Sequence, residues 1–198
     1  MRRAPHPTRC ALALALLAGL LAHPAGAEDA AYSLDTLLAS LRTHAHRHAT
    51  FTERFTTRVL DRPVEASGEL IYDAPDHLEK RTLKPRPERL ALEGATLTVE
   101  RRHRTLTTTL AAYPEAAPYI DSVRATLAGD RAALERVFRV EFSGTRAAWT
   151  LLLAPRAAAD AARVSQIRLD GSDDRIGTVR ITLANGDESL MTLSDSGE

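Results

Sequence analysis

The sequence predicts an α+β domain in which about eleven antiparallel strands form a sheet that curls into a barrel or half barrel, with helices against its open concave face. Two observations carry this prediction. From Thr50 onwards, apolar and polar residues alternate in short segments separated by turn residues, as is typical of antiparallel strands. Three other stretches repeat with helical spacing, one before the strands and two among them. The open concave face of the sheet is where such helices can bury their apolar sides.

The N-terminal helix is predicted over residues 33–48. Ser33 can cap its first turn, and Asp35 suits the positive end of the helix dipole. A spacing of i, i+3, i+4 and i+7 places four leucines on one stripe, which predicts the buried side of the helix. These leucines are Leu34, Leu37, Leu38 and Leu41.

The strands are predicted to occupy most of the remaining chain. Phe51, Glu53 and Phe55 share one face of the first strand, because side chains alternate along a strand. The Glu93-Gly94 and Asn185-Gly186-Asp187 segments indicate tight hairpin turns. The eleven predicted strands cover residues 50–56, 69–73, 77–83, 88–92, 96–100, 105–110, 138–142, 147–154, 164–170, 176–183 and 188–193.

Two mid-chain helices are predicted over residues 115–128 and 131–136, and we expect them to pack against the open concave face of the sheet. Gly129 can end the first helix, and Asp130 can cap the second. Their apolar residues are expected to face the sheet. These residues, which would belong to a lid if the helices cover a binding surface, are Ile120, Val123, Leu127 and Leu134.

Residues 1–27 have the pattern of a secretory signal peptide. Three arginines precede an apolar run over residues 11–22, and Ala-Gly-Ala at residues 25–27 offers a small-residue cleavage site. The run is shorter than the roughly 20 residues of a membrane span. The only cysteine, Cys10, would leave with the peptide, so no lipid anchor is expected. We therefore expect residues 28–198 to form one exported, periplasmic domain.

The charge composition argues against a nucleic-acid partner. The chain has 26 basic and 26 acidic residues, and the signal peptide carries three of the basic ones, so the mature part is slightly acidic. A nucleic-acid-binding protein usually has a basic surplus. The sequence also contains no nucleophile elbow, zinc-protease motif or phosphate-binding glycine loop.

Three histidines form the candidate metal cluster of the chain. If the first helix reaches His48, then His44 and His48 lie four residues apart on one face and can share a metal, as in a metal-dependent hydrolase. His46 would point to the opposite side. In the alternative interpretation, the histidines form a polar last turn that suits the negative end of the helix dipole. We favour this alternative and expect no metal or cofactor.

Three carboxylates gather around the turn at Pro75, namely Asp73, Asp76 and Glu79. Asp73 and Asp76 are candidates for an acid–base pair. Aspartates are also common in turns because of their hydrogen bonds to the backbone alone. With no other catalytic motif in the sequence, we do not expect an enzyme.

The predicted strands carry a set of apolar side chains that can be interpreted in two ways. In a small closed sheet these side chains would fill an ordinary core, whereas a wider sheet would leave a cavity for a ligand. On the second interpretation, the ligand-binding residues are Phe51, Phe55, Leu70, Tyr72, Phe138, Val140, Phe142, Trp149, Leu151 and Leu153.

The order of several short motifs resembles the LolA-like family of periplasmic outer-membrane lipoprotein carriers, in particular a divergent branch of that family. The motifs span nearly the whole mature chain. They are Phe51-Thr-Glu-Arg-Phe55, Gly68-Glu-Leu-Ile-Tyr-Asp-Ala-Pro75, Leu127-Ala-Gly-Asp130, Trp149-Thr-Leu-Leu-Leu-Ala-Pro155, Ile167-Arg-Leu-Asp-Gly171 and the closing Asn185-Gly-Asp hairpin.

The resemblance implies an unclosed barrel with a helical lid that shields the acyl chains of a lipoprotein between an inner-membrane donor complex and an outer-membrane acceptor. The main carrier branch has an arginine just before the proline of the second motif, which latches the lid. Here that position is Ala74, so another residue would hold the lid, with Arg81 and Arg54 as candidates, or the cargo would differ, for example a glycolipid. We expect a monomeric carrier; a lipid-sensing or partner-binding module on the same fold is the alternative.

Overall fold

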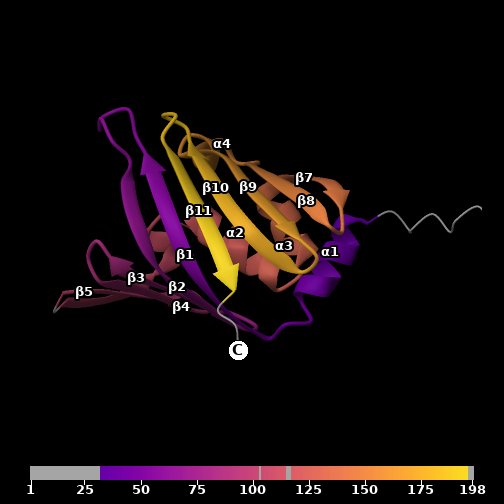
Figure 1. The fold of residues 1–198 in the computed structure, drawn as a ribbon, viewed down its shortest axis with the longest axis horizontal. Coiled ribbons are helices and arrows are strands. Elements are labelled where there is room, and N and C mark those ends of the chain that lie inside the picture. The colour runs from indigo at the N-terminus through magenta and orange to yellow at the C-terminus, as the bar shows by residue number, and fades with distance from the viewer. Residues whose placement is uncertain (1–31, 103, 115–116, 196–198) are drawn as a thin grey trace, which may run out of the picture. The chain divides into compact units, whose positions relative to one another are not determined.

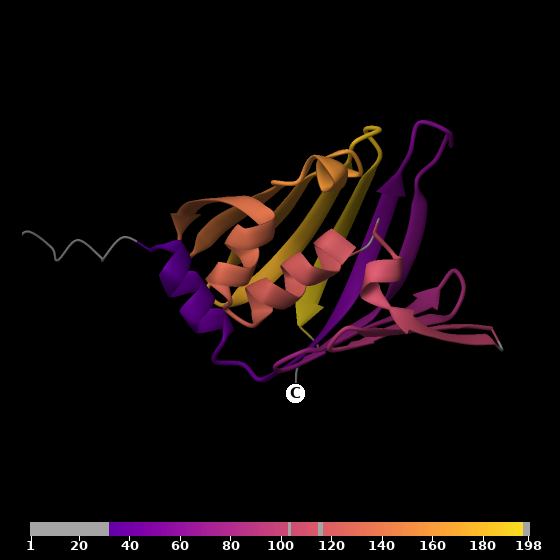
Figure 2. The same ribbon diagram turned by 180° about the vertical axis from the view of Figure 1, so that it is seen from behind.

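The fold of the computed structural model is one unclosed antiparallel sheet with helices on one face (Figures 1 and 2). The structure describes residues 32–102, 104–114 and 117–195, so the predicted signal peptide lies outside the described residues. In this part of the chain the sheet has eleven strands in the order β6-β5-β4-β3-β2-β1-β11-β10-β9-β8-β7. The predicted fold class and strand number are confirmed.

The strands pair with their neighbours in sequence, except where β1 pairs with β11. That single pairing joins two meanders and leaves β6 and β7 as free edges of the sheet. The bounds are β1 His46–Thr56, β2 Val64–Asp73, β3 His77–Lys84, β4 Glu88–Glu93, β5 Thr96–Arg101, β6 Arg104–Thr109, β7 Phe138–Thr145, β8 Ala148–Pro155, β9 Val164–Ser172, β10 Arg175–Leu183 and β11 Glu188–Asp195.

Helix α1, Leu34–Leu41, is shorter than predicted. Its N-terminus is capped as expected, because the Ser33 hydroxyl accepts a hydrogen bond from the Thr36 amide at 3.2 Å, and its four leucines are buried. The extension to His48 was wrong, since β1 already begins at His46. The apolar helical spacing stops at Leu41, and the ladder with β2 satisfies the backbone of the residues that follow.

Helices α2, Ala117–Leu127, and α3, Arg131–Val137, lie across the inner face of the sheet (Figure 2). Gly129 joins them with φ of +67°, and a Cβ there would come within 2.6 Å of the Leu38 carbonyl oxygen. Glycine is therefore required both for the turn and for the close approach of α1. Asp130 caps α3 as predicted by accepting a hydrogen bond from the Ala133 amide at 2.8 Å.

The buried side of α2 differs from the predicted one. Ser122 and Thr126 are fully buried, whereas Ile120 and Val123 are half-buried. The two hydroxyls can be buried because each donates a hydrogen bond to a carbonyl of its own helix. Leu127 and Leu134 are buried as expected.

Two short helical segments were not predicted, the 3-10 turn η1, Leu110–Ala112, and α4, Ala158–Ala161. Segments of three or four residues are too short to show a helical period. Among the described residues, none of the helices is long and apolar enough to cross a membrane.

Buried apolar residues form two clusters against the inner face of the sheet. The larger joins the leucines of α1 and Leu134 of α3 to Trp149 and its neighbours on β7 to β10. The smaller consists of Leu92, Leu97 and Leu110, and Ile120 of α2 packs against it. Helix α2 thus contacts both clusters, because Tyr119 packs against the larger one.

Candidate functional site

The register of the strands places all ten predicted ligand-binding residues on the face that carries the helices. Residues directly opposite each other in neighbouring strands project from the same face. Phe51 lies opposite Gly68 of β2 and Leu193 of β11, and Leu151 lies opposite Phe142 and Leu169. Because side chains alternate along β1, β2, β7 and β8, the other predicted residues project from this face too.

These ten residues divide into two groups by burial. Six are core residues, exposed by 2% or less: Phe51, Tyr72, Phe138, Trp149, Leu151 and Leu153. The other four are half-buried: Phe55, Leu70, Val140 and Phe142. The packed-core interpretation therefore applies to the first group, while the second remains within reach of a ligand.

Two hollows in the described part of the chain are lined by mixed side chains rather than by an apolar surface. One, of about 350 Å³, lies between α2, α3 and the β2–β3 turn, where Asp76, Asp121 and Arg124 contribute to its wall. The other, of about 590 Å³, lies over β9 to β11 and includes Asp170 and Arg175. The leucines of α1 and α3 pack against the inner face at β7 to β10, so an acyl chain could enter that part of the face only if helices moved.

An arginine on the inner face of the sheet contacts the end of α1. Arg47 of β1 lies opposite Tyr72, and its Nη2 donates a hydrogen bond to the Leu41 carbonyl at 3.3 Å. Burial lowers the pKa of the Arg47 guanidinium, and the nearby Asp174 carboxylate opposes that shift. Among the described residues its Nε is a buried donor without a partner. Arg47 therefore joins the C-terminal end of α1 to β1. Only part of the hydrogen-bonding capacity of its guanidinium is used in this contact.

A second arginine joins helix α2 to the turn between β4 and β5. Nη1 of Arg124 donates to the Gly94 carbonyl in the β4–β5 turn at 2.5 Å, and Nη2 contacts Asp121 at 2.7 Å. Burial raises the pKa of the Asp121 carboxyl, and Arg124 counteracts this shift. Helix α2 itself carries the cation, and the turn between β4 and β5 supplies the acceptor.

The two arginines suggested from sequence to hold the lid lie on the opposite face. Arg81 of β3 lies opposite Glu69 of β2, and Arg54 of β1 lies opposite Glu65 of β2. Because side chains alternate along a strand, both pairs project from the face opposite to that of Phe51 and Gly68. Neither can contact a helix on the inner face, so that suggestion was wrong. Arg47 and Arg124 could not be singled out from sequence, because their acceptors are backbone carbonyls of distant segments.

Replacement of Arg124 by methionine should loosen α2 without unfolding the sheet. The half-exposed charged hydrogen bond is worth about 1 kcal/mol, so amide hydrogen exchange in α2 should become about fivefold faster. Arg139→Met on the outer face of β7 is the matched control and should leave exchange in α2 unchanged. Equal exchange in both variants would show that Arg124 does not hold the helix.

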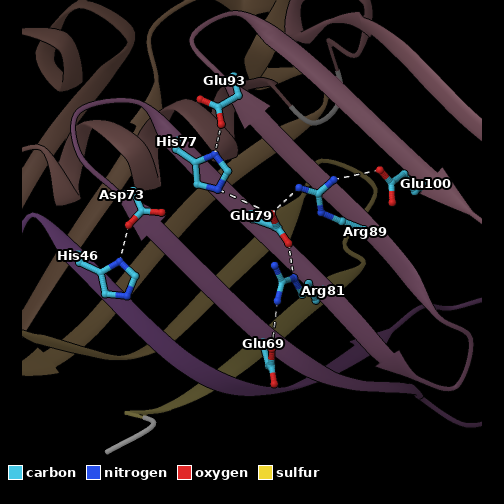
Figure 3. Close-up of polar contacts among 9 residues, drawn as sticks. All are labelled: His46, Glu69, Asp73, His77, Glu79, Arg81, Arg89, Glu93 and Glu100. Carbon is cyan, nitrogen blue, oxygen red and sulfur yellow. Dashed lines mark hydrogen bonds and ion pairs between the residues drawn. The ribbon is translucent and has the colours of Figure 1, made fainter. Parts of the chain in front are cut away.

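The three histidines of the candidate metal cluster separate in space. His44 lies in the loop after α1 and contacts Asp174, while His46 and His48 lie on the outer face of β1 beside Asp73 and Glu69 (Figure 3 for His46). Because α1 ends at Leu41, the candidate pair on one helical face does not exist, and the favoured interpretation of the histidines as a last helical turn was also wrong. No group of three potential ligands with metal geometry occurs in the described residues.

Two of the three carboxylates around Pro75, Asp73 and Glu79, engage basic partners rather than one another, and Asp76 lines the hollow beside α2. Asp73 is paired with His46. Glu79 is buried on the outer face between Arg81 and Arg89, with Arg89 at 2.7 Å (Figure 3). The hydrogen bond from Arg89 is the main reason that the pKa of the Glu79 carboxyl is lowered. This arrangement keeps Glu79 ionised and joins β3 to β4, a structural role rather than acid–base chemistry.

The architecture is that of an unclosed half-barrel whose apolar inner face is covered by helices. The chain belongs to the family described as outer membrane lipoprotein carrier protein LolA-like, whose model matches residues 22–196. A search of the curated proteins found no match to the chain.

Solved structures similar to the chain include a LolA superfamily protein from Nitrosomonas europaea, with 11% identity, a TM-score of 0.47 and coverage of 83% of this chain and 91% of the other. A DUF1329 family protein from Desulfovibrio piger has 9% identity, a TM-score of 0.46 and coverage of 82% and 89%. A chain of the MucA/MucB complex of Pseudomonas aeruginosa has 10% identity and a TM-score of 0.40, and the match covers 82% of this chain and 56% of that one.

Proposed function

We propose that the protein is a periplasmic carrier that shields the acyl chains of a lipoprotein, or of a related lipid, and moves this cargo from an inner-membrane donor to an outer-membrane acceptor. Residues 1–27 would direct export and be removed. The family supports this proposal, since it is described by lipoprotein carriage. Burial of each acyl methylene is worth about 0.8 kcal/mol, so free acyl chains cannot cross water unshielded.

The observation that carries the proposal is the apolar character of the inner face beyond the packed core. Leu70, Val140 and Phe142 are half-buried there, and Leu106 of β6, opposite Val99, is 52% exposed. Exposed apolar side chains that form one contiguous surface are a mark of a binding site. The helices pack on this face through apolar side chains, and their movement would extend it.

The first test is mass spectrometry of lipids and lipopeptides extracted from the protein after purification from periplasm without detergent. Stoichiometric acylated material is the expected result and would identify the cargo. A folded protein that carries only traces of lipid and binds no hydrophobic fluorescent probe would overturn the proposal in favour of a partner-binding module.

Replacement of Phe142 by glutamate should weaken binding of a hydrophobic fluorescent probe at least tenfold while the protein stays folded. Phe142 is half-buried near the free edge of the sheet, where a carboxylate can reach water in the empty protein but not under an acyl chain. Ser143→Glu, on the outer face of the same strand, is the matched control. Equal probe affinity in both variants would contradict the assignment of the surface.

A further inference from the structure

The free edge of the sheet at β6 lacks the features that normally protect such an edge. β6 is a terminal strand among the described residues, and five of its six residues are exposed. Natural edge strands carry charges, proline or bulges, because their unpaired amides and carbonyls otherwise pair with another chain. β6 has no proline, its pairing with β5 is continuous, and its only charged residue is Arg104 at the first position. The other edge strand, β7, carries both Arg139 and Glu141.

The backbone groups of β6 that point away from the sheet can be assigned from the register. The Leu110 amide donates to the Ala95 carbonyl at 2.9 Å, in line with the β5–β6 ladder. Because bonded and non-bonded positions alternate in an antiparallel ladder, every second residue before Leu110 directs its amide and carbonyl away from β5. These residues are Thr105, Thr107 and Thr109, and all three are exposed. An added strand therefore finds three outward amides and three outward carbonyls.

A row of partly exposed apolar side chains crosses the inner face and ends at this edge. The register aligns its members on neighbouring strands; they are Leu70, Leu90, Val99 and Leu106. Between the first two stands Lys80, whose ammonium lies 2.5 Å from the Glu53 carboxylate across β2. Neighbouring strands are about 4.8 Å apart, so the row from β2 to β6 spans roughly 19 Å, a length comparable with that of an extended palmitoyl chain.

We propose that β6 binds, by strand addition, the polypeptide segment that adjoins the acylated residue of the cargo, an inference that rests on the proposed function. The segment exchanges backbone hydrogen bonds with Thr105, Thr107 and Thr109. Side chains of a strand project from the faces of its sheet, so a lipid attached to one that projects inward can lie along the apolar row. The cargo is then a lipoprotein rather than a free lipid.

Two arguments favour this occupant of the edge. Affinity from main-chain hydrogen bonds does not depend on the sequence of the added strand, which suits a carrier that recognises its cargo by the lipid. A second copy of this chain would pair with the edge but leave the apolar row open to water, whereas a lipidated segment covers both.

The test uses lipopeptides, in which S-hexadecylcysteine is followed by alternating serine and threonine, as competitors of a hydrophobic fluorescent probe. Two isomers carry N-methyl groups on every second amide, in opposite phase, so only one of them loses the donors that face β6. That isomer should compete with the wild-type protein at least tenfold more weakly than the other, as expected for the loss of about two backbone hydrogen bonds. Both isomers carry the same lipid and the same number of methyl groups.

Replacement of Thr107 by proline removes an outward donor and places a ring in the path of the added strand. The β5–β6 ladder does not use this amide, so the domain should stay folded, which circular dichroism checks. The two isomers should then compete equally, while the affinity for the probe persists. Thr107→Ala, which loses the hydroxyl but keeps the amide, is the matched control and should retain the preference.

Equal competition by the two isomers with the wild-type protein would overturn the inference, as would a preference that survives in Thr107→Pro. A dimer that protects the outward amides of β6 from hydrogen exchange without lipopeptide would also overturn it, because a second copy would then occupy the edge. Each of these results with normal probe binding leaves the carrier proposal standing. If the wild-type protein binds neither the probe nor the lipopeptides, the carrier proposal and the strand addition are both wrong.

Discussion

Replacement of Leu151 by glutamate is expected to unfold the domain rather than to empty a binding surface. Leu151 is 0% exposed, within the cluster formed by α1 and the strands β7 to β10. A carboxylate at this position would have neither water nor a cationic partner, and the cost of such burial is in the range of about 4–5 kcal/mol or more. Domains of this size are stable by only about 5–15 kcal/mol. Urea unfolding followed by circular dichroism measures the loss.

The neighbouring residue on the same strand provides the control for this substitution. Leu152 lies on the outer face of β8 between Glu141 and Arg168 and is half-buried. A glutamate there can reach water and Arg168, so Leu152→Glu should cost no more than about 1 kcal/mol. Similar losses of unfolding free energy at Leu151 and Leu152 would mean that the core does not lie on the inner face.

Replacement of Glu79 by glutamine is expected to lower the free energy of unfolding by about 2 kcal/mol. The carboxylate is 2% exposed and accepts hydrogen bonds from Arg81 and Arg89. Glutamine keeps the shape but loses the charge, and its amide NH₂ would face guanidinium donors. Arg81 and Arg89 are partly exposed, and their hydration limits the loss. The exposed Glu141 of β7 provides the control variant, Glu141→Gln, which should change stability little.

The contribution of Glu79 to stability should depend on pH. Because the pKa of its carboxyl is lowered in the folded protein, this contribution is fully present above the ordinary carboxyl pKa of about 4.3. It declines as the pH falls from there through the lower folded value. The difference between wild type and Glu79→Gln, measured by urea unfolding, should therefore shrink between pH 7 and pH 3. A difference that stays constant over this range would contradict the role of the ionised carboxylate.

Most strands could be predicted because the signal for a strand is local. Because side chains alternate along a strand, Phe51, Glu53 and Phe55 share one face whichever strands pair with theirs. The histidines after Leu41 show the limit of local patterns. A four-residue spacing suits a helix, but the pairing of β1 with β2 decided the conformation of His46 and His48.

The candidate site could be predicted only as a list of apolar side chains. Phe142 and Leu151 carry the same sequence signal, yet one remains half-buried and the other is fully buried. Phe142 lies on the edge strand β7, whereas Leu151 lies on β8 with a strand on either side. The roles of Arg47 and Arg124 also depended on which distant carbonyl lies beside each guanidinium.

By itself, the sequence determined the fold class, the succession of strands along the chain and their faces, and the caps of α1 and α3, since each depends on periodicity or on a contact within a few residues. Only the tertiary structure decided which apolar residues are core, how the helices are held, and that Lys80 meets Glu53 across β2. These features depend on the β1–β11 pairing and on helix packing, whose free energy comes from contacts between segments far apart in the chain.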